Sequence, residues 1–462
     1  MKSIVLPERY ISIVNKVVLA AKEENNFDAY IVGGFVRDLF LDREPKDLDI
    51  MVRSKDETED GRFAGINFSK ILAKKYSLRD PVVFERFGTS KLFIDNEEVE
   101  FVMPRKEYYT FDSRNPDTTL GSLEQDALRR DFTINALFLR LSDMTILDFT
   151  SNGVKDIKNK TIRATDPKNA EIIFSQDPLR ILRAARQSLQ LSFSIEPLTY
   201  NAMKTSVKRI DIVSPERIRD ELNKIIIEPT PSKAFLMMDN INLLQELLPE
   251  LARLKNLEQP TKYHVDDVFT HSLKVLDRTR NDVALRMAAL LHDIGKFKTY
   301  KKDSDKISFL GHDAESAKEA EAILKRLKYA KDFIGRVCSI IKNHMYPKTY
   351  TNDWSDGAIR RFVKRCGNEF NLAMEISKAD YGRKNDKNKL AELNARIEDL
   401  KLKNALYPKD EMFSGKELMK IFDKPAGKWI QIAKNKIEEL QIENPSITKD
   451  GAIKAVKDLK IF

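Results

Sequence analysis

The sequence contains little cysteine and no long apolar run. Cys338 and Cys366 are the only cysteines among 462 residues, which excludes a disulfide framework and a zinc knuckle and favours a reducing compartment. No apolar segment reaches the roughly 18 residues that a membrane-spanning helix needs. Residues 14–21 are mildly apolar, but no small-residue cleavage site follows them. We therefore expect a cytoplasmic protein that does not cross a membrane, with residues 14–21 in an amphipathic helix.

The chain is long and carries a modest positive charge. Its length indicates about three compact units, each able to bury a core. Lysine and arginine number 80 against 71 aspartate and glutamate residues, which gives a net charge of +9. This excess favours a polyanionic partner such as a nucleic acid, although a lysine-rich composition alone does not identify one.

The apolar pattern changes along the chain. The first 150 residues alternate short β-rich runs with helical stretches, which predicts an α/β or α+β domain. From about Ile172 the spacing becomes helical, with helices at residues 179–186 and 215–227. Residues 256–381 are also helical and contain all five histidines, and a charged tail follows. The expected strands are residues 29–32, 48–52, 91–94, 99–103 and 145–149.

Two aspartates begin one of these strands. Asp47 and Asp49 are two residues apart, so on a strand they share one face while Leu48 and Ile50 face the core. Side-by-side carboxylates repel unless a cation joins them, and Mg²⁺ prefers such oxygen ligands. Glu100, in a later strand, completes a candidate two-metal site. Taken alone, an Asp-x-Asp pair is more often a pair of ordinary surface acids.

A glycine pair precedes the aspartates. Gly33 and Gly34 lie between a strand and an amphipathic helix, where backbone N–H groups can approach a triphosphate and Arg37 can add a charged fork. A Gly-Gly pair alone predicts only a tight turn. Followed by Asp-x-Asp at this spacing, Gly-Gly-x-x-Arg-Asp resembles the signature of DNA polymerase β-type nucleotidyltransferases.

Two further segments carry arginines beside acids or amides. Asp131 and Asn135 are four apart, hence on one face of an expected helix, beside Arg130. These groups suit a ribose and its phosphates, although each alone is typical of a helix start.

In the second segment an acid and three arginines repeat every three residues along one side of a helix. A carboxylate and a guanidinium one turn apart can select the Watson–Crick edge of a base without a template. The acid, Asp177, precedes Pro178 and is also a good helix cap, and both interpretations are compatible. The four residues are Asp177, Arg180, Arg183 and Arg186.

These segments occur in the order of one known family. Together with Glu216–Leu222 (Glu-Arg-Ile-Arg-Asp-Glu-Leu), they cover roughly the first half of the chain. The sequence resembles the class II tRNA nucleotidyltransferases (CCA-adding enzymes), a family that includes the bacterial poly(A) polymerases. The matching residues are Gly33-Gly34 with Arg37-Asp38, Asp47-Leu48-Asp49, Arg129-Arg130-Asp131 with Asn135-Ala136, and Asp177-Pro178-Leu179-Arg180 with Arg183 and Arg186.

The resemblance implies roles for several residues. It implies Mg²⁺ on Asp47 and Asp49, and base selection by Asp177 and Arg180. One departure bears on the product, because the residue before the base-reading aspartate is often glutamate in the family and is Gln176 here. Full CCA specificity is therefore less firmly implied than nucleotide addition. Contacts to the triphosphate and sugar are implied for Gly34, Arg37 and Arg130.

The resemblance also implies a fold. We expect an α+β protein with a polymerase β-like head that holds a small antiparallel or mixed sheet, followed by a helical neck, body and tail. The expected boundaries are residues 1–165 for the head, 166–255 for the neck with the base-reading helix, 256–385 for an HD-type body and 386–462 for the tail.

The histidine-rich region has a pattern of its own. His292 and Asp293 lie in Leu-His-Asp-Ile-Gly-Lys, with His271 upstream and Asp380 downstream. This series resembles the HD phosphohydrolase pattern, in which histidine and carboxylate ligands bind divalent metal and activate water. The alternative is a relic domain that supports the RNA. His312 and His344 fall where further metal ligands occur in that superfamily, and His264 is the fifth histidine of the region.

The leading hypothesis is a template-independent enzyme that adds CCA to tRNA 3′ ends. It would use CTP, ATP and Mg²⁺ and release pyrophosphate by in-line attack. Alternatives are an enzyme that adds only CC, only A or a poly(A) tail, an HD phosphohydrolase with an RNA-binding head, and a non-catalytic RNA-binding protein. A second divalent metal (Mn, Ni, Mg or Fe) is expected in the HD region, and the protein is expected to be a monomer or a homodimer.

Overall fold

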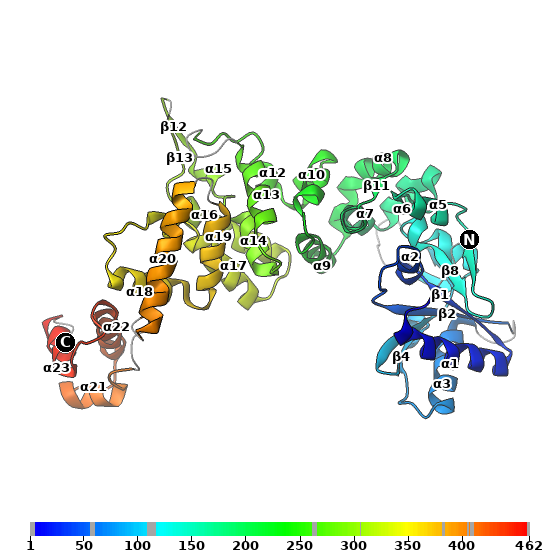
Figure 1. Ribbon diagram of the computed structural model, residues 1–462, viewed down its shortest axis with the longest axis horizontal. Helices are drawn as coiled ribbons and strands as arrows, with labels where there is room; N and C mark the ends of the chain where they lie inside the picture. Colours follow the sequence, from blue (N-terminus) through cyan, green and yellow to red (C-terminus); the bar gives the residue numbers. More distant parts are fainter. Residues whose placement is uncertain are drawn as a thin grey trace. The chain divides into compact units, whose positions relative to one another are not determined.

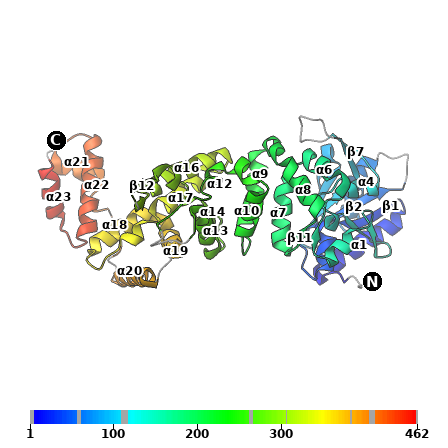
Figure 2. The same cartoon turned by 90° about the horizontal axis from the view of Figure 1, so that it is seen from above.

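Contacts within a computed structural model divide the chain into two compact units (Figures 1 and 2). The first comprises Met1–Glu228 and Lys233–Leu247, and the second comprises Pro229–Ser232 and Leu248–Phe462. Among the described residues, no helix has the length and apolar character that crossing a membrane requires. The structure describes residues 5–55, 61–108, 117–260, 266–304, 306–380, 384–403, 406 and 411–459.

A mixed seven-stranded sheet forms the centre of the first unit (Figure 1). In sheet order its strands are β3 (Val82–Phe84), β4 (Thr89–Ile94), β5 (Glu97–Val102), β2 (Leu48–Ser54), β1 (Phe27–Val32), β8 (Leu137–Arg140) and β9 (Thr145–Asp148). β2 and β5 are parallel, whereas the other neighbouring pairs are antiparallel. The expected strands are all present, and the α+β fold class is confirmed.

Helices cover both faces of this sheet. Phe68 of α3 (Ala64–Lys75) packs against Phe27 and Phe101 at ring-centroid distances of 5.3 and 6.1 Å. On the other face, Leu123 of α4 (Leu123–Leu128) joins a buried cluster with Phe138. Alternation along β2 and β5 puts the acidic residues on the α4 face. The remaining elements are α1 (Glu8–Glu24), α2 (Gly34–Phe40), α5 (Gly153–Lys158) and the hairpin of β6 (Arg105–Tyr108) and β7 (Asp117–Leu120).

Helices make up the rest of the first unit. The apolar side of α7 is buried, including Ile181, Leu182 and Ala185, and this leaves its arginine side toward a cavity. α7 packs against α9, which begins with Pro215, where the sequence predicts the start of a helix. The helices are α6 (Ala170–Gln176), α7 (Leu179–Leu191), α8 (Pro197–Ser206), α9 (Pro215–Ile226), α10 (Ser232–Asn240) and α11 (Leu243–Leu247), with a parallel pair of β10 (Thr161–Ile162) and β11 (Ser194–Ile195).

The described residues of the second unit are helical apart from one short hairpin. Its first helices are α12 (Pro249–Ala252), α13 (Val268–Arg278), α14 (Val283–Leu291) and α15 (Lys296–Thr299), followed by β12 (Lys301–Asp303), β13 (Lys306–Ser308), α16 (His312–Arg326) and α17 (Lys331–Asn343). Next come α18 (Asp356–Cys366), α19 (Phe370–Asp380) and α20 (Lys384–Leu402). Three helices at the C-terminal end, α21 (Gly415–Phe422), α22 (Lys428–Glu443) and α23 (Lys449–Asp458), gather around a separate small core (Figures 1 and 2).

One expected helix is absent from its place. Residues 129–136 form a turn and a bend, an isolated β-bridge at Phe132 and a 3₁₀ turn at Thr133–Asn135, so the expected helix face of Asp131 and Asn135 is wrong. Phe132 is buried and bridges to Ala164. The backbone N–H of Thr133 donates to the carbonyl of Arg163 at 2.9 Å. Hydrogen bonds to a neighbouring segment therefore replace those of a helix.

Phe68 offers a test of the packing between α3 and the sheet. Its side chain is fully buried, so Phe68→Ala should destabilise the first unit by about 3–5 kcal/mol. The matched control is Phe93→Ala on β4, because Phe93 is 57% exposed. Denaturant unfolding followed by fluorescence measures both. Equal stability of the two variants would contradict the packing described.

Candidate functional site

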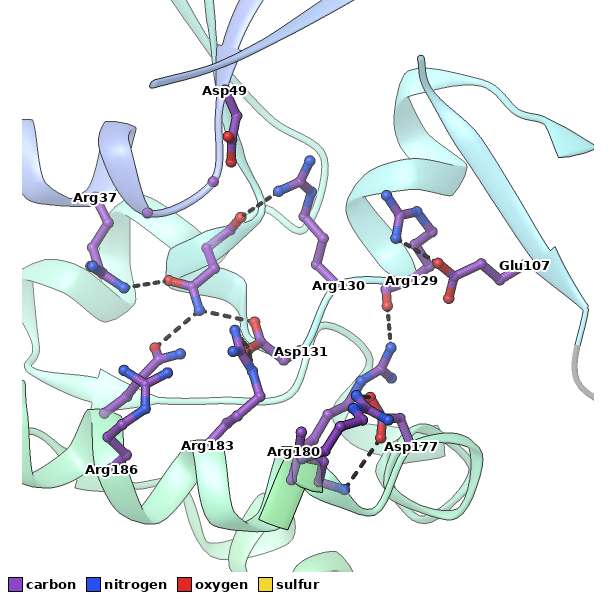
Figure 3. Close-up of a pocket in the computed structure, with 16 residues that line it drawn as sticks. Arg37, Asp49, Glu107, Arg129, Arg130, Asp131, Asp177, Arg180, Arg183 and Arg186 are labelled. Atoms are coloured by element: carbon purple, nitrogen blue, oxygen red, sulfur yellow. Dashed lines mark hydrogen bonds and ion pairs between the residues drawn. The ribbon is translucent and has the colours of Figure 1, made fainter. Parts of the chain in front are cut away.

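A cavity of about 650 Å³ in the first unit collects most of the residues singled out in the sequence (Figure 3). Seven arginines and four acids line it, so the cavity is electropositive and suits a polyanion such as a triphosphate. Asp49 faces the cavity from one side, and Arg183 and Arg186 face it from the other (Figure 3). The lining residues are Gly33, Gly34, Arg37, Asp49, Glu107, Arg129, Arg130, Asp131, Asn135, Asp177, Leu179, Arg180, Arg183, Arg186, Gln187 and Arg217.

The candidate metal ligands meet because β2 and β5 are parallel neighbours. Asp49 lies opposite Glu100 in the strand register, and Asp47 immediately precedes β2. Burial and then the nearby carboxylate of Glu100 are the main causes that raise the pKa of Asp49 to about 6, and Asp47 acts in the same direction to a smaller extent. Two neighbouring carboxylates thus disfavour the charged form of Asp49. A divalent cation that prefers oxygen ligands fits this donor set.

Asp49 also lines a second cavity of about 440 Å³, which Asp47 borders as well. Basic side chains from two parts of the unit, Arg43 and Lys46 between α2 and β2 and Lys224 of α9, border the same space. Asp49 therefore lies where two basic cavities meet.

The glycine pair and Arg37 lie at the rim of the larger cavity. Gly33 has a φ of +77°, and a Cβ there would lie 3.1 Å from Nη1 of Arg130. Helix α2 starts at Gly34. The Nη1 group of Arg37 donates to Oδ1 of Asn135 at 2.8 Å, and its Nη2 lies 2.8 Å from a carboxylate oxygen of Asp38. Arg37 is thus fixed in place.

A buried aspartate that the sequence reasoning missed holds two of the arginines. Asp126 is fully buried, and its carboxylate lies 2.6 Å from Nη2 of Arg129 and 2.9 Å from Nη2 of Arg130. Burial opposes ionisation, but Arg130 and then Arg129 hold its pKa below the usual value. The i, i+3 and i, i+4 spacing of Asp126 to the arginine pair is the sequence signal for this contact.

An ion pair and a hydrogen bond connect the loop after α4 to α7. Asp131 lies 2.7 Å from Nη2 of Arg183, and Nδ2 of Asn135 donates to Asp131 at 2.9 Å and to Gln187 at 3.0 Å. Burial disfavours the charge of Asp131, yet Arg183 and Asn135 lower its pKa to about 2. Asp131 therefore stays ionised across the physiological pH range.

Asp177 and Arg180, the pair expected to read the base, are each held by different groups. Arg180 is buried and donates to the main-chain carbonyls of Ile173 and Arg129, at 3.1 and 2.6 Å. Oδ1 of Asp177 accepts the backbone N–H of Leu179 at 3.3 Å, so the side chain caps the start of α7 while it also lines the cavity. The structure describes no side-chain contact for Gln176 that bears on either residue.

The second unit brings four of the five histidines together; the fifth, His264, lies outside the described residues. Two groups of three residues place their potential ligand atoms within 4.8 Å of one another inside each group. One group is His271, His292 and Asp380, and the other is His292, Asp293 and His344. His312 belongs to the same cluster, because its Nε2 lies 3.4 Å from Oδ1 of Asp293. These residues come from α13, α16, α19 and the ends of α14 and α17.

The histidine tautomers suit metal binding. Nδ1 of His292, His312 and His344 lies 2.8, 2.8 and 2.6 Å from the carbonyl three residues earlier. A carbonyl only accepts, so Nδ1 carries the proton and Nε2 presents a lone pair to the cluster. Within the described chain, Nε2 of His344 is buried without a hydrogen-bond partner. Burial, then the neighbouring His292 and His312, hold the pKa of His344 well below its usual value.

Two lysines complete the histidine cluster. Nζ of Lys296 lies 2.7 Å from Oδ2 of Asp293, and Lys348 forms an ion pair with Asp380. Imidazole nitrogens with carboxylate oxygens form a donor set that fits a divalent transition metal.

Three family descriptions match consecutive parts of the chain. Residues 29–163 match the Poly A polymerase head domain, residues 192–255 match a probable RNA and SrmB-binding site of polymerase A, and residues 263–385 match the HD domain. The multifunctional CCA protein of Dechloromonas aromatica is 32% identical over 319 residues, which cover 66% of this chain and 70% of that protein. The chain belongs to the family of tRNA nucleotidyltransferases and poly(A) polymerases.

Other relatives match this chain over different shares of their own length. The A-adding tRNA nucleotidyltransferase of Deinococcus radiodurans is 36% identical over 256 residues, or 53% of this chain. The match spans 56% of that relative, little more than half of its length. The crystal structure of the Bacillus stearothermophilus CCA-adding enzyme with CTP has the same fold, with a TM-score of 0.67, 20% identity and coverage of 98% of both chains.

The raised pKa of Asp49 generates a prediction about pH. Protons compete with a cation at this carboxylate below its pKa of about 6, so Mg²⁺ affinity should fall as pH drops through 6, approaching roughly tenfold per pH unit. Calorimetric titrations at pH 5.0, 6.0 and 7.5 measure this. The same titrations of Asp49→Ala measure Mg²⁺ binding at other sites, which is subtracted. An Asp49-dependent affinity that is constant over this range would contradict the electrostatics described.

Proposed function

We propose that this protein adds nucleotides to the 3′ end of tRNA and completes the CCA terminus from CTP and ATP. The observation that carries the proposal is the electropositive cavity with Asp49 on one side and the arginine side of α7 on the other. Membership of the nucleotidyltransferase family supports the reaction. An A-adding relative acts on tRNA by its name, which supports the substrate.

In the proposed reaction the terminal hydroxyl of the RNA attacks the α-phosphate of the nucleotide. A bond forms between that oxygen and the α-phosphorus, the hydroxyl proton passes to solvent, the bond from the α-phosphorus to the bridging oxygen breaks, and pyrophosphate leaves. Asp47, Asp49 and Glu100 would hold Mg²⁺, which when bound would lower the pKa of the attacking hydroxyl and offset charge on the leaving group. Asp47 is exposed and Asp49 is half-buried, so the cation would stay accessible to both reactants.

The arginines divide the other tasks in this proposal. Arg37 and Arg130 would bind the triphosphate, with Gly33 and Gly34 leaving room for its approach. Asp131 and Asn135 would position the ribose. Asp177 and Arg180 would read the base. Arg183 and Arg186, on the same side of α7, would hold this helix in place through their bonds to Asp131 and Glu221.

The family matches support the first three of four proposed regions of the chain. We propose residues 1–165 as the head, 166–255 as the neck, 256–385 as the HD-type body and 386–462 as the tail. Cys338 and Cys366 are free thiols, which supports a cytoplasmic location. The proposal also includes a monomer or a homodimer as the working form.

Extension of tRNA transcripts tests the proposed function. Transcripts that lack the final one or three nucleotides are incubated with CTP and ATP, separately and together. Asp47→Ala should reduce incorporation at least a thousandfold, by the usual order of loss for a metal ligand, while tRNA binding persists. Asp80→Ala, an exposed acid of the same unit, is the control. Undiminished incorporation by Asp47→Ala would refute the assignment, and products that end in CC, A or poly(A) would identify the narrower alternatives.

A second candidate function rests on the histidine cluster. We propose that His271, His292, Asp293 and Asp380 hold a divalent metal (Mn, Ni, Mg or Fe), with His312 and His344 as further ligands, and that the centre hydrolyses phosphoesters. Four imidazoles around two buried aspartates support this proposal. When bound, the metal would supply an activated water, and Lys296 could contact a phosphate oxygen after release from Asp293.

Two variants separate the two candidate activities. His292→Ala should lose bound transition metal, measured by plasma mass spectrometry, and should lose hydrolysis of a 2′,3′-cyclic phosphate while tRNA extension continues. Asp47→Ala should show the reverse pattern for the two activities. Unchanged metal content in His292→Ala would refute the metal centre.

A further inference from the structure

Asp177 lies outside the regular part of both helices that flank it. Its φ of −136° and ψ of 90° are extended, it ends α6, and Pro178 separates it from α7. Backbone geometry alone therefore does not aim its side chain along the reading face of α7. The direction of the carboxylate depends on the groups that bind it.

Both carboxylate oxygens of Asp177 accept hydrogen bonds. Oδ1 accepts the N–H of Leu179 at 3.3 Å, and Oδ2 accepts Nη2 of Arg217 at 2.8 Å. The second bond is shorter and joins two opposite charges, so it is the stronger of the two. Arg217 belongs to α9 and lines the cavity that Asp177 also lines.

Arg180 is fixed by other groups. It donates to two main-chain carbonyls, those of Ile173 and Arg129, and does so from a buried position. Loss of Arg217 would therefore leave the direct supports of Arg180 in place. The two members of the proposed reading pair can be perturbed separately.

Helix α9 supports the arginine side of α7 at more than one point. Glu221, one turn after Arg217, lies 2.7 Å from Nε of Arg186 and 3.7 Å from Nη1 of Arg183. One face of α9 therefore contacts three residues that line the cavity. Within that face, Arg217 is the residue that contacts Asp177.

The chemistry of the bases gives this contact a consequence. Cytosine and adenine present an exocyclic amine where uracil and guanine present a carbonyl oxygen. An ionised carboxylate accepts from the amine and repels the carbonyl oxygen, provided that it stays ionised and correctly aimed.

We propose that Arg217 is a positioning residue for base discrimination, which holds Asp177 so that it accepts CTP and ATP and rejects UTP and GTP. This inference rests on the proposed nucleotide addition. Arg217 does not take part in the chemistry in this account. Its loss should lower selectivity more than it lowers the rate with the correct nucleotides.

Steady-state incorporation with each of the four nucleotides tests the inference. Arg217→Met should raise the ratio of kcat/KM for UTP over CTP, and for GTP over ATP, by roughly tenfold or more, since each good polar contact to a base gives about that discrimination. Arg217→Lys keeps the charge but not the planar fork and should fall between Arg217→Met and the wild-type chain. The matched control is Arg219→Met, two residues along α9, where the arginine pairs with Asp220.

A double-mutant cycle makes the test independent of a general loss of stability. In an Asp177→Asn background, Arg217→Met should change the selectivity ratios little, because the carboxylate that it positions is gone. Equal losses with all four nucleotides, or unchanged ratios in Arg217→Met, would overturn the inference. A wild-type chain that incorporates neither CTP nor ATP would instead refute the proposed function itself.

Discussion

The ion pair between Asp131 and Arg183 is the contact on which the cavity depends. It joins the loop after α4, which belongs to the sheet-containing part of the first unit, to the arginine side of α7. The Asp131 side chain is buried, whereas the Arg183 side chain is 34% exposed. Removal of Arg183 would leave a buried carboxylate without its counter-charge, and solvent around Arg183 keeps the loss below the order of 3–5 kcal/mol that is typical of a fully buried pair.

Much of the carboxylate site was predictable because it follows from strand alternation. Asp47, Asp49 and Glu100 lie at positions that the period of two fixes, and parallel pairing of β2 and β5 then brings them together. The supporting residues were harder to predict. Asp126 lies close to its arginines in sequence, whereas Arg217 reaches Asp177 only because α7 and α9 pack together, and a contact 40 residues distant leaves no local pattern.

The wrong expectation about the segment after α4 has a physical cause. The segment around Asp131 has helical spacing, but Phe132 is buried and Thr133 bonds both the carbonyl of Arg163 and the carboxylate of Asp156. These tertiary contacts outweigh a weak local preference for helix. Asp131 and Asn135 still meet, by a direct hydrogen bond of 2.9 Å. The histidine cluster was easier to predict, because a motif string and the confinement of all five histidines to one region indicated it together.

The central claim is that nucleotide and cation meet at Asp49. Diffraction from crystals grown with Mn²⁺ and a non-hydrolysable CTP analogue, with anomalous differences collected for manganese, tests this most directly. We expect an anomalous peak beside Asp47 and Asp49, with the triphosphate along Arg37 and Arg130 and the base beside Asp177. A well-ordered analogue bound elsewhere, or manganese confined to the histidine cluster, would contradict it.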